Sequence, residues 1–86
     1  YVRGLTDLAC AFVERHRNRP WFLYLSHYFP HPKVIAPDSL VGQYLDRGYP
    51  PYGLNAAHYL AGLEHLDRQT GRLLDKLKEL GLYDNT

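Results

Sequence analysis

The sequence predicts an α/β fold. A helix, a strand, a long loop and a long helix are expected to follow one another, as a fragment of a larger protein with a mostly parallel sheet. Apolar residues recur at helical spacing near both ends of the chain, and an almost continuous apolar run of strand length lies between them. A stretch rich in proline and glycine separates that run from the second helix. One strand alone cannot satisfy its backbone groups or cover its apolar faces. We therefore expect residues 1–86 to be an incomplete, internal part of a larger domain.

The composition is that of a globular protein, with 45% hydrophobic and 22% charged residues. A net charge of +1 gives no electrostatic reason to expect nucleic acid or an anionic membrane as partner. No apolar run approaches the roughly 20 residues of a membrane span. Methionine is absent, so we expect Tyr1 not to be the native start. With Cys10 as the one cysteine, no intramolecular disulfide is possible and no cellular compartment is indicated.

The first helix is predicted from a single apolar stripe. Thr6 or Asp7 is a candidate N-cap, because either side chain can accept a hydrogen bond from a free backbone N–H. Pro20 is expected to end the stretch, since proline has no N–H to continue a helix. The members of the stripe have i, i+3, i+4, i+7, i+8 spacing: Leu5, Leu8, Ala9, Phe12 and Val13.

The predicted strand covers residues 21–26, which read WFLYLS. Because its hydrophobicity is continuous rather than alternating, we expect both faces to be covered, as in a parallel sheet. Residues 27–53 then hold five of the six prolines, which predicts a long irregular connection with one short helical turn near residues 39–44. Loops of this length in compact proteins are often functional.

The second helix is predicted to begin after Asn55, a candidate N-cap, and to carry a leucine-rich apolar stripe. Gly81 supplies the expected stop, with Leu82 placed to pack back on the last turn. Asp84 and Asn85 are typical of a turn, and Thr86 is placed to begin a further strand.

Candidate functional residues follow the predicted strand directly. His27, His31 and Lys33 fall within seven residues, at the carboxyl end of the strand, where parallel sheets bind ligands. They could present hydrogen-bond donors to an anionic ester. Alternatively, the histidines are structural residues of an aromatic loop. A third interpretation makes His27 and His31 metal ligands, but their spacing is not diagnostic outside a helix and no third ligand is evident.

Three pieces of the chain resemble the sulfatase family, in the right order and spacing. The first is a strand that runs into a loop with a histidine before a proline-containing stretch. The second is a long helix, and the third is the turn that follows it. They read PWFLYLS at 20–26 with Pro30-His31 and Ala36-Pro37, EHLDRQTGRLLD at 64–75, and LGLYDNT at 80–86.

The resemblance implies an alkaline-phosphatase-like α/β fold, of which residues 1–86 are an internal, incomplete part of the catalytic domain. It also implies hydrolysis of sulfuric esters by the full-length enzyme, with a bound divalent cation, usually calcium. The family's nucleophile is a formylglycine made from Cys or Ser in a Cys/Ser-x-Pro/Ala-x-Arg motif. The family's loop histidine contacts the sulfate and protonates the leaving oxygen, and this role carries over to His31, since imidazole titrates near neutral pH. Lys33 could reach an anionic substrate, although a solvated lysine is the other interpretation.

The sequence departs from the family pattern in its loop. The family commonly has His-x-Pro, whereas here Pro32 follows His31 directly and restricts it to extended backbone geometry. Cys10 is followed by Ala-Phe-Val-Glu, so it is not the formylglycine site. No paired aspartates suit the metal, and Asp84-Asn85 resembles the turn before the metal-binding strand. The nucleophile and the metal ligands are therefore expected outside this segment.

Functions other than sulfate-ester hydrolysis are also compatible with the sequence. Phosphonate monoester and phosphodiester hydrolases of the same superfamily share much of the core, and a non-catalytic helical interaction fragment is a candidate from another class.

The expected partners are a sulfate-ester substrate and the rest of the chain's own catalytic domain. The loop around Tyr44, Tyr49 and Tyr52 could shape the leaving-group pocket. On the second helix, the candidate surface or packing residues are His58, His65 and Asp67.

Overall fold

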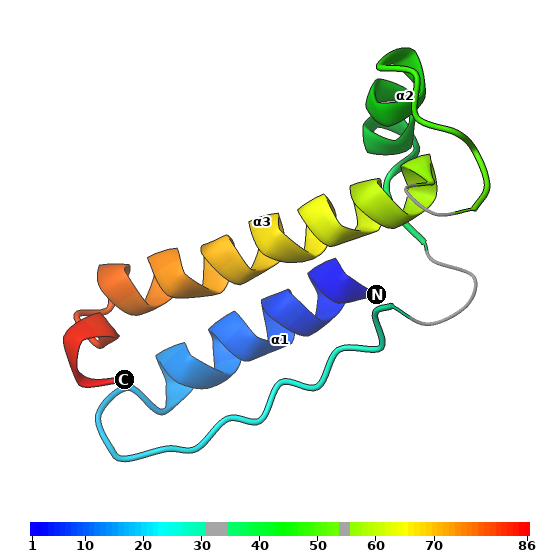
Figure 1. The fold of residues 1–86 in the computed structure, drawn as a ribbon. Coiled ribbons are helices and arrows are strands. Elements are labelled where there is room, and N and C mark those ends of the chain that lie inside the picture. Colours follow the sequence, from blue (N-terminus) through cyan, green and yellow to red (C-terminus); the bar gives the residue numbers. More distant parts are fainter. Residues whose placement is uncertain (31–34, 54–55) are drawn as a thin grey trace. The chain divides into compact units, whose positions relative to one another are not determined.

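The computed structural model describes residues 1–30, 35–53 and 56–86. Within them lie α1 (Val2–Arg15), α2 (Asp38–Asp46), α3 (Ala57–Glu79) and a short 3-10 helix, η1 (Tyr83–Asn85) (Figure 1). The chain divides into two compact units, of which unit 1 comprises residues 1–27 and 68–86 and unit 2 comprises residues 28–67. The long helix α3 contributes its first part to unit 2 and its second part to unit 1.

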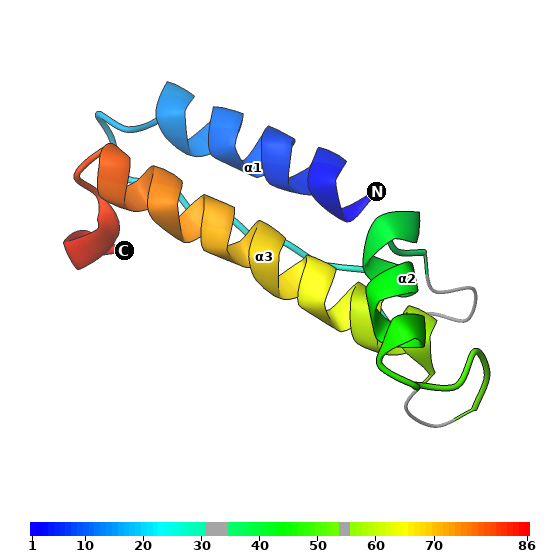
Figure 2. The same cartoon turned by 90° about the horizontal axis from the view of Figure 1, so that it is seen from above.

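In unit 1, α1 and the second part of α3 lie side by side and run in the same direction (Figures 1 and 2). Arg72 Nη2 lies 2.7 Å from Asp7 Oδ1, and Lys76 Nζ lies 3.8 Å from Glu14 Oε2. Ion pairs at such exposed positions contribute at most about 1 kcal/mol each. Burial between the helices is therefore the main source of stability in this unit. The buried side chains are Val2, Thr6, Ala9, Val13, Gln69 and Leu77.

The predicted cap of the first helix is wrong. α1 begins at Val2, with Tyr1 at the N-cap and no side-chain cap bond. Thr6 is buried inside the helix, where its hydroxyl donates to the Val2 carbonyl oxygen at 3.0 Å. The helix starts earlier than the apolar stripe predicted because Val2 itself is buried. Leu8, a member of that stripe, is 69% exposed, and the helix ends at Arg15, before Pro20 is reached.

The strand predicted over residues 21–26 is not confirmed. The part of the chain that the structure describes contains no strand, and this segment is extended but unpaired. Its side chains alternate, with Trp21, Leu23 and Leu25 half-buried while Phe22 and Tyr24 are 85% and 80% exposed. A strand needs a partner to satisfy its N–H and C=O groups, and the described residues offer none. The parallel sheet of the predicted α/β fold is accordingly not shown.

Unit 2 has a small core where α2 meets the start of α3. Leu40 and Val41 of α2 pack with Ala57 and Ala61 of α3, and both alanines are fully buried. The helical turn predicted near residues 39–44 is confirmed as part of α2. Pro37 precedes it, and its carbonyl oxygen accepts hydrogen bonds from the N–H groups of Leu40 and Val41, both at 3.0 Å. Ala36 and Tyr44 pack against this core as partly buried residues.

The predicted end of the long helix is confirmed. Gly81 has φ 74°, which a residue without Cβ adopts at little cost. The Leu82 N–H donates to the Leu77 carbonyl oxygen at 2.8 Å, and the Gly81 N–H donates to that of Lys78 at 3.0 Å. These two bonds form a Schellman motif. The predicted N-cap, Asn55, lies outside the described residues. No helix in the described part of the chain combines the length and the apolar character needed to cross a membrane.

Candidate functional site

The two site residues predicted from the sequence, His31 and Lys33, lie in the segment 31–34, outside the described residues. Their roles therefore stay predictions. His27 is described and half-buried, and its Nδ1 atom is buried without a hydrogen-bond partner among the described residues. An unsatisfied buried polar atom costs about 1–3 kcal/mol. We therefore expect a partner for this atom from outside the described part of the chain.

Described residues on both sides of this segment pack within unit 2. On one side, the rings of Phe29 and Tyr59 have centroids 5.4 Å apart and an interplanar angle of 37°. Such a pair contributes about 0.5–1.5 kcal/mol beyond its buried area. On the other side, Ala36 packs against the core that includes Ala57 and Ala61. Within unit 2, Phe29 thus contacts the first part of α3, and Ala36 packs against the core that α2 and α3 form together.

A polar and aromatic cluster joins α2 to α3 in the same unit. The Tyr44 hydroxyl donates to Glu64 Oε2 at 2.5 Å. The Arg47 guanidinium carbon lies 4.7 Å from the centre of the Tyr44 ring, and the Tyr49 ring meets that ring edge-on at 5.6 Å. Tyr44 is therefore engaged in fixing α2 on α3. Tyr52, which belongs to the loop proposed to shape the leaving-group pocket, is 86% exposed.

The hydrogen bond to Glu64 raises the pKa of Tyr44 above 10.0, with smaller contributions from desolvation and from the charge of Glu64. The folded state therefore holds the phenolic proton more tightly than the unfolded state does. The resulting stability is fully present below the pKa of an unfolded tyrosine, about 10. It is lost as the pH rises through the higher folded pKa.

We expect Tyr44→Phe to remove this alkaline dependence. In the full-length protein, the variant should show a flatter decline of the unfolding midpoint above pH 10 than the unmodified protein. Urea unfolding between pH 8 and pH 11 measures it, with Tyr83→Phe as the control because Tyr83 lies in η1, in unit 1. A decline of equal steepness in Tyr44→Phe and the unmodified protein would show that the Tyr44–Glu64 bond does not set this dependence.

Metal-ligating side chains do not gather in the described part of the chain. His58 and Asp67 are exposed on α3 and His65 is half-buried there, so these residues occupy surface and partly packed positions. No group of three or more His, Cys, Asp or Glu residues among those described is arranged to hold a metal ion. The thiol of Cys10 is free and half-buried in α1.

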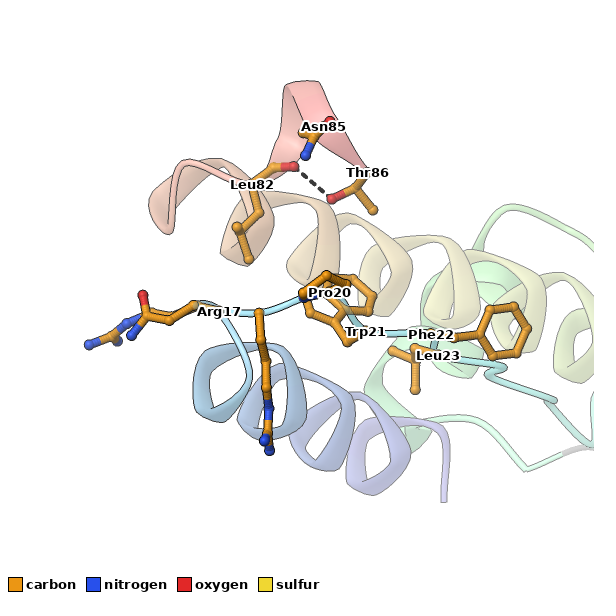
Figure 3. A pocket seen from close by; sticks show the side chains of 10 residues that line it. Arg17, Pro20, Trp21, Phe22, Leu23, Leu82, Asn85 and Thr86 are labelled. Atoms are coloured by element: carbon orange, nitrogen blue, oxygen red, sulfur yellow. Dashed lines mark hydrogen bonds between the residues drawn. The ribbon is translucent and has the colours of Figure 1, made fainter.

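Unit 1 has an open groove of about 680 Å³ between the start of the extended segment and the last residues of the chain (Figure 3). The Thr86 hydroxyl, on its rim, donates to the Leu82 carbonyl oxygen at 2.6 Å. The lining side chains include no carboxylate, imidazole or thiol, so the groove offers no general acid or base of those kinds. Its residues are Arg17, Asn18, Arg19, Pro20, Trp21, Phe22, Leu23, Leu82, Asn85 and Thr86.

The contacts that flank the histidine loop could not be predicted from the sequence. Tyr59 falls within the predicted long helix, and Phe29 had no predicted role. Periodicity assigns a residue to a helix face but does not identify its partner across an irregular loop. The same holds for Tyr44 and Glu64, which lie 20 positions apart.

The chain matches a single protein family in the comparisons with known proteins. The sulfatase family model matches residues 1–86. Mouse (Mus musculus) steryl-sulfatase is 34% identical over 85 residues, which cover 99% of this chain and 12% of that protein. The uncharacterized sulfatase YdeN of Escherichia coli (strain K12) is 31% identical over 84 residues, covering 95% of this chain and 14% of YdeN. Human (Homo sapiens) arylsulfatase H is 31% identical over 78 residues, covering 91% and 12%.

The chain thus spans 12–14% of the length of these curated relatives. The match includes the extended segment with the histidine loop, the long helix and the turn that follows it, since the family model covers them all. These are the three pieces on which the sequence resemblance was based. The chain therefore belongs to the sulfatase family.

Proposed function

We propose that residues 1–86 form part of the catalytic domain of a sulfuric ester hydrolase and supply His31 to its active site. The observation that carries this proposal is the family match over residues 1–86, because it includes the histidine loop as well as the helices. The printed names of the relatives include steryl-sulfatase and arylsulfatase. A sulfate ester of an alcohol or a phenol is the substrate class that these names support.

In the proposed mechanism, His31 acts as a general acid. As the S–O bond of the ester breaks, its electron pair goes to the bridging oxygen, and the imidazolium of His31 gives that oxygen a proton. The alcohol then leaves neutral, and the sulfuryl group passes to a nucleophile outside this segment. Unperturbed imidazole has a pKa of about 6.5, so it holds or releases this proton near neutral pH.

Lys33 is proposed to contact the sulfate oxygens. An ammonium attracts an anionic group most strongly where water is excluded, because the effective dielectric constant is lower there. A lysine that stays in solvent would contribute little to binding. KM distinguishes the two interpretations. Loss of a contact that is made equally in the bound substrate and in the transition state raises KM and leaves kcat unchanged.

A formylglycine and a divalent cation, expected to be calcium, are proposed to complete the site from other parts of the full-length protein. Cys10 lacks the required flanking residues, and the described residues hold no cluster of metal ligands. When bound, such a cation supplies charge stabilisation to an anionic transition state. The contribution of this segment is limited to proton donation and substrate contact by the histidine loop.

The test is substrate preference of the purified full-length protein. We expect 4-nitrophenyl sulfate to be hydrolysed with a kcat/KM at least about 100-fold above that for bis(4-nitrophenyl) phosphate or a 4-nitrophenyl phosphonate monoester. Higher activity on either phosphorus ester would assign the protein to the related phosphonate monoester or phosphodiester hydrolases. Absence of activity on all three esters would favour the non-catalytic interpretation.

A further inference from the structure

We propose that one face of α1, centred on Leu8, is covered in the full-length protein by a β-strand that pairs with the extended segment 21–26. The inference rests on the part of the proposed function that places residues 1–86 inside a larger catalytic domain. It does not depend on the role of any histidine. The helix and the extended segment both belong to unit 1.

Two stripes of α1 have clear surroundings in unit 1. Residues at i, i+4 and i+7 share one face of a helix, and the buried stripe consists of Val2, Thr6, Ala9 and Val13. The second stripe is mostly polar and consists of Arg3, Asp7, Cys10 and Glu14. Its two carboxylates form the ion pairs with Arg72 and Lys76 of α3.

The third stripe, which we name the outward face, is apolar but exposed. Leu8 is 69% exposed at its centre, and Gly4 and Ala11 are exposed one turn before and after it. The charged side chains of α1 lie on the polar stripe or at Arg15, the last residue of the helix. A helix that is apolar on more than one face is typical of a position with neighbours on more than one side.

The extended segment already covers the edge of the outward face. Phe12 lies one turn after Leu8, and its ring meets the Trp21 ring edge-on, with centroids 6.2 Å apart. Neighbouring strands lie about 4.8 Å apart, whereas a helix with its side chains is about 10–12 Å wide. One extended segment is therefore too narrow to cover this side of α1, and a second strand beside it would reach Leu8.

The unpaired backbone of the extended segment identifies the occupant as a strand. Residues 21–26 form no backbone hydrogen bond with the described part of the chain. A strand alongside them would satisfy these N–H and C=O groups and place apolar side chains on the outward face. The chain spans 12–14% of the length of its curated relatives. A protein of their length thus has ample further chain to supply this strand.

Cysteine accessibility in the full-length protein tests the proposal. Leu8→Cys and Arg3→Cys are made in a Cys10→Ala background, and alkylation by iodoacetamide is followed by mass spectrometry of the peptide that contains the new thiol. Arg3 is the matched control, because it is exposed on the polar stripe of the same helix. In the folded protein we expect the thiol at position 8 to react at least about 100-fold more slowly than that at position 3, since alkylation requires access to the sulfur. In urea the two rates should be similar.

Ala11→Cys, on the same face, provides the same test if Leu8→Cys fails to fold. A thiol at position 8 that reacts as fast as the one at position 3 would overturn the proposal, whether both react rapidly or both slowly. Protection that is lost on dilution would assign the cover to a second copy of the protein and would also overturn it. Alkylation does not require hydrolysis, so absence of activity on the three esters would reject the proposed sulfatase activity without deciding this result.

Discussion

Replacing His31 with alanine in the full-length protein should lower turnover of phenyl sulfate by about 10²–10⁴-fold. The physical reason is that a phenolate or alkoxide leaves poorly unless a proton reaches the bridging oxygen as the S–O bond breaks. An alanine cannot supply that proton, and water does so less effectively because it is not held in position. The loss should appear in kcat, with a smaller change in KM.

Steady-state kinetics and urea unfolding of the same preparation measure this effect. The control is His58→Ala, which removes a histidine exposed on α3 and should change turnover less than about twofold. The unfolding midpoint of His31→Ala should stay close to that of the unmodified protein. Near-normal turnover in His31→Ala would eliminate the proposed acid role. A large drop in the stability of this variant would indicate that His31 is a structural residue.

A charge at Tyr24 should reduce association of the isolated 86-residue chain, whereas in the full-length protein it should lower the stability of the fold. In the isolated chain the Tyr24 side chain is 80% exposed on the uncovered face of the extended segment. Tyr24→Asp should reduce association through this face, because a carboxylate on an unpaired strand edge disfavours pairing with another copy. In the full-length protein we expect the same face to be covered. Burial of an unpaired carboxylate there should cost several kcal/mol.

Sedimentation of the isolated chain and thermal unfolding of the full-length protein measure the two effects. Tyr83→Asp serves as the control, since Tyr83 lies in η1 rather than on the extended segment. The unmodified isolated chain should be partly helical and should associate. A full-length Tyr24→Asp protein of unchanged stability would show that this face stays exposed, and the prediction of a strand covered on both faces would then fail.

The helices could be predicted from the sequence because their signals are local. The turn predicted near residues 39–44 lies within α2, and Gly81 ends the long helix as its freedom at positive φ led us to expect. The N-cap of α1 could not be predicted, since burial of Val2 extends the helix beyond the stripe and leaves Thr6 inside it. Tertiary packing, rather than local propensity, set that boundary.

The strand and the site depend on partners that local patterns do not reveal. Residues 21–26 have strand composition, but a ladder requires a neighbouring strand, and the described residues contain none. The contact of Phe29 with Tyr59 joins positions 30 apart across an irregular loop, which periodicity cannot foresee. His31 was identified by resemblance to the family, and its role remains to be tested in the full-length protein.

Sequencing the coding region on both sides of this segment tests the central claim most directly. The proposal that residues 1–86 belong to a working sulfatase predicts a Cys/Ser-x-Pro/Ala-x-Arg motif upstream. It also predicts a strand that bears an Asp-Asn pair just after Thr86. A native start and stop codon flanking these residues would contradict the proposal, because the chain would then lack both the nucleophile and the metal ligands of its family.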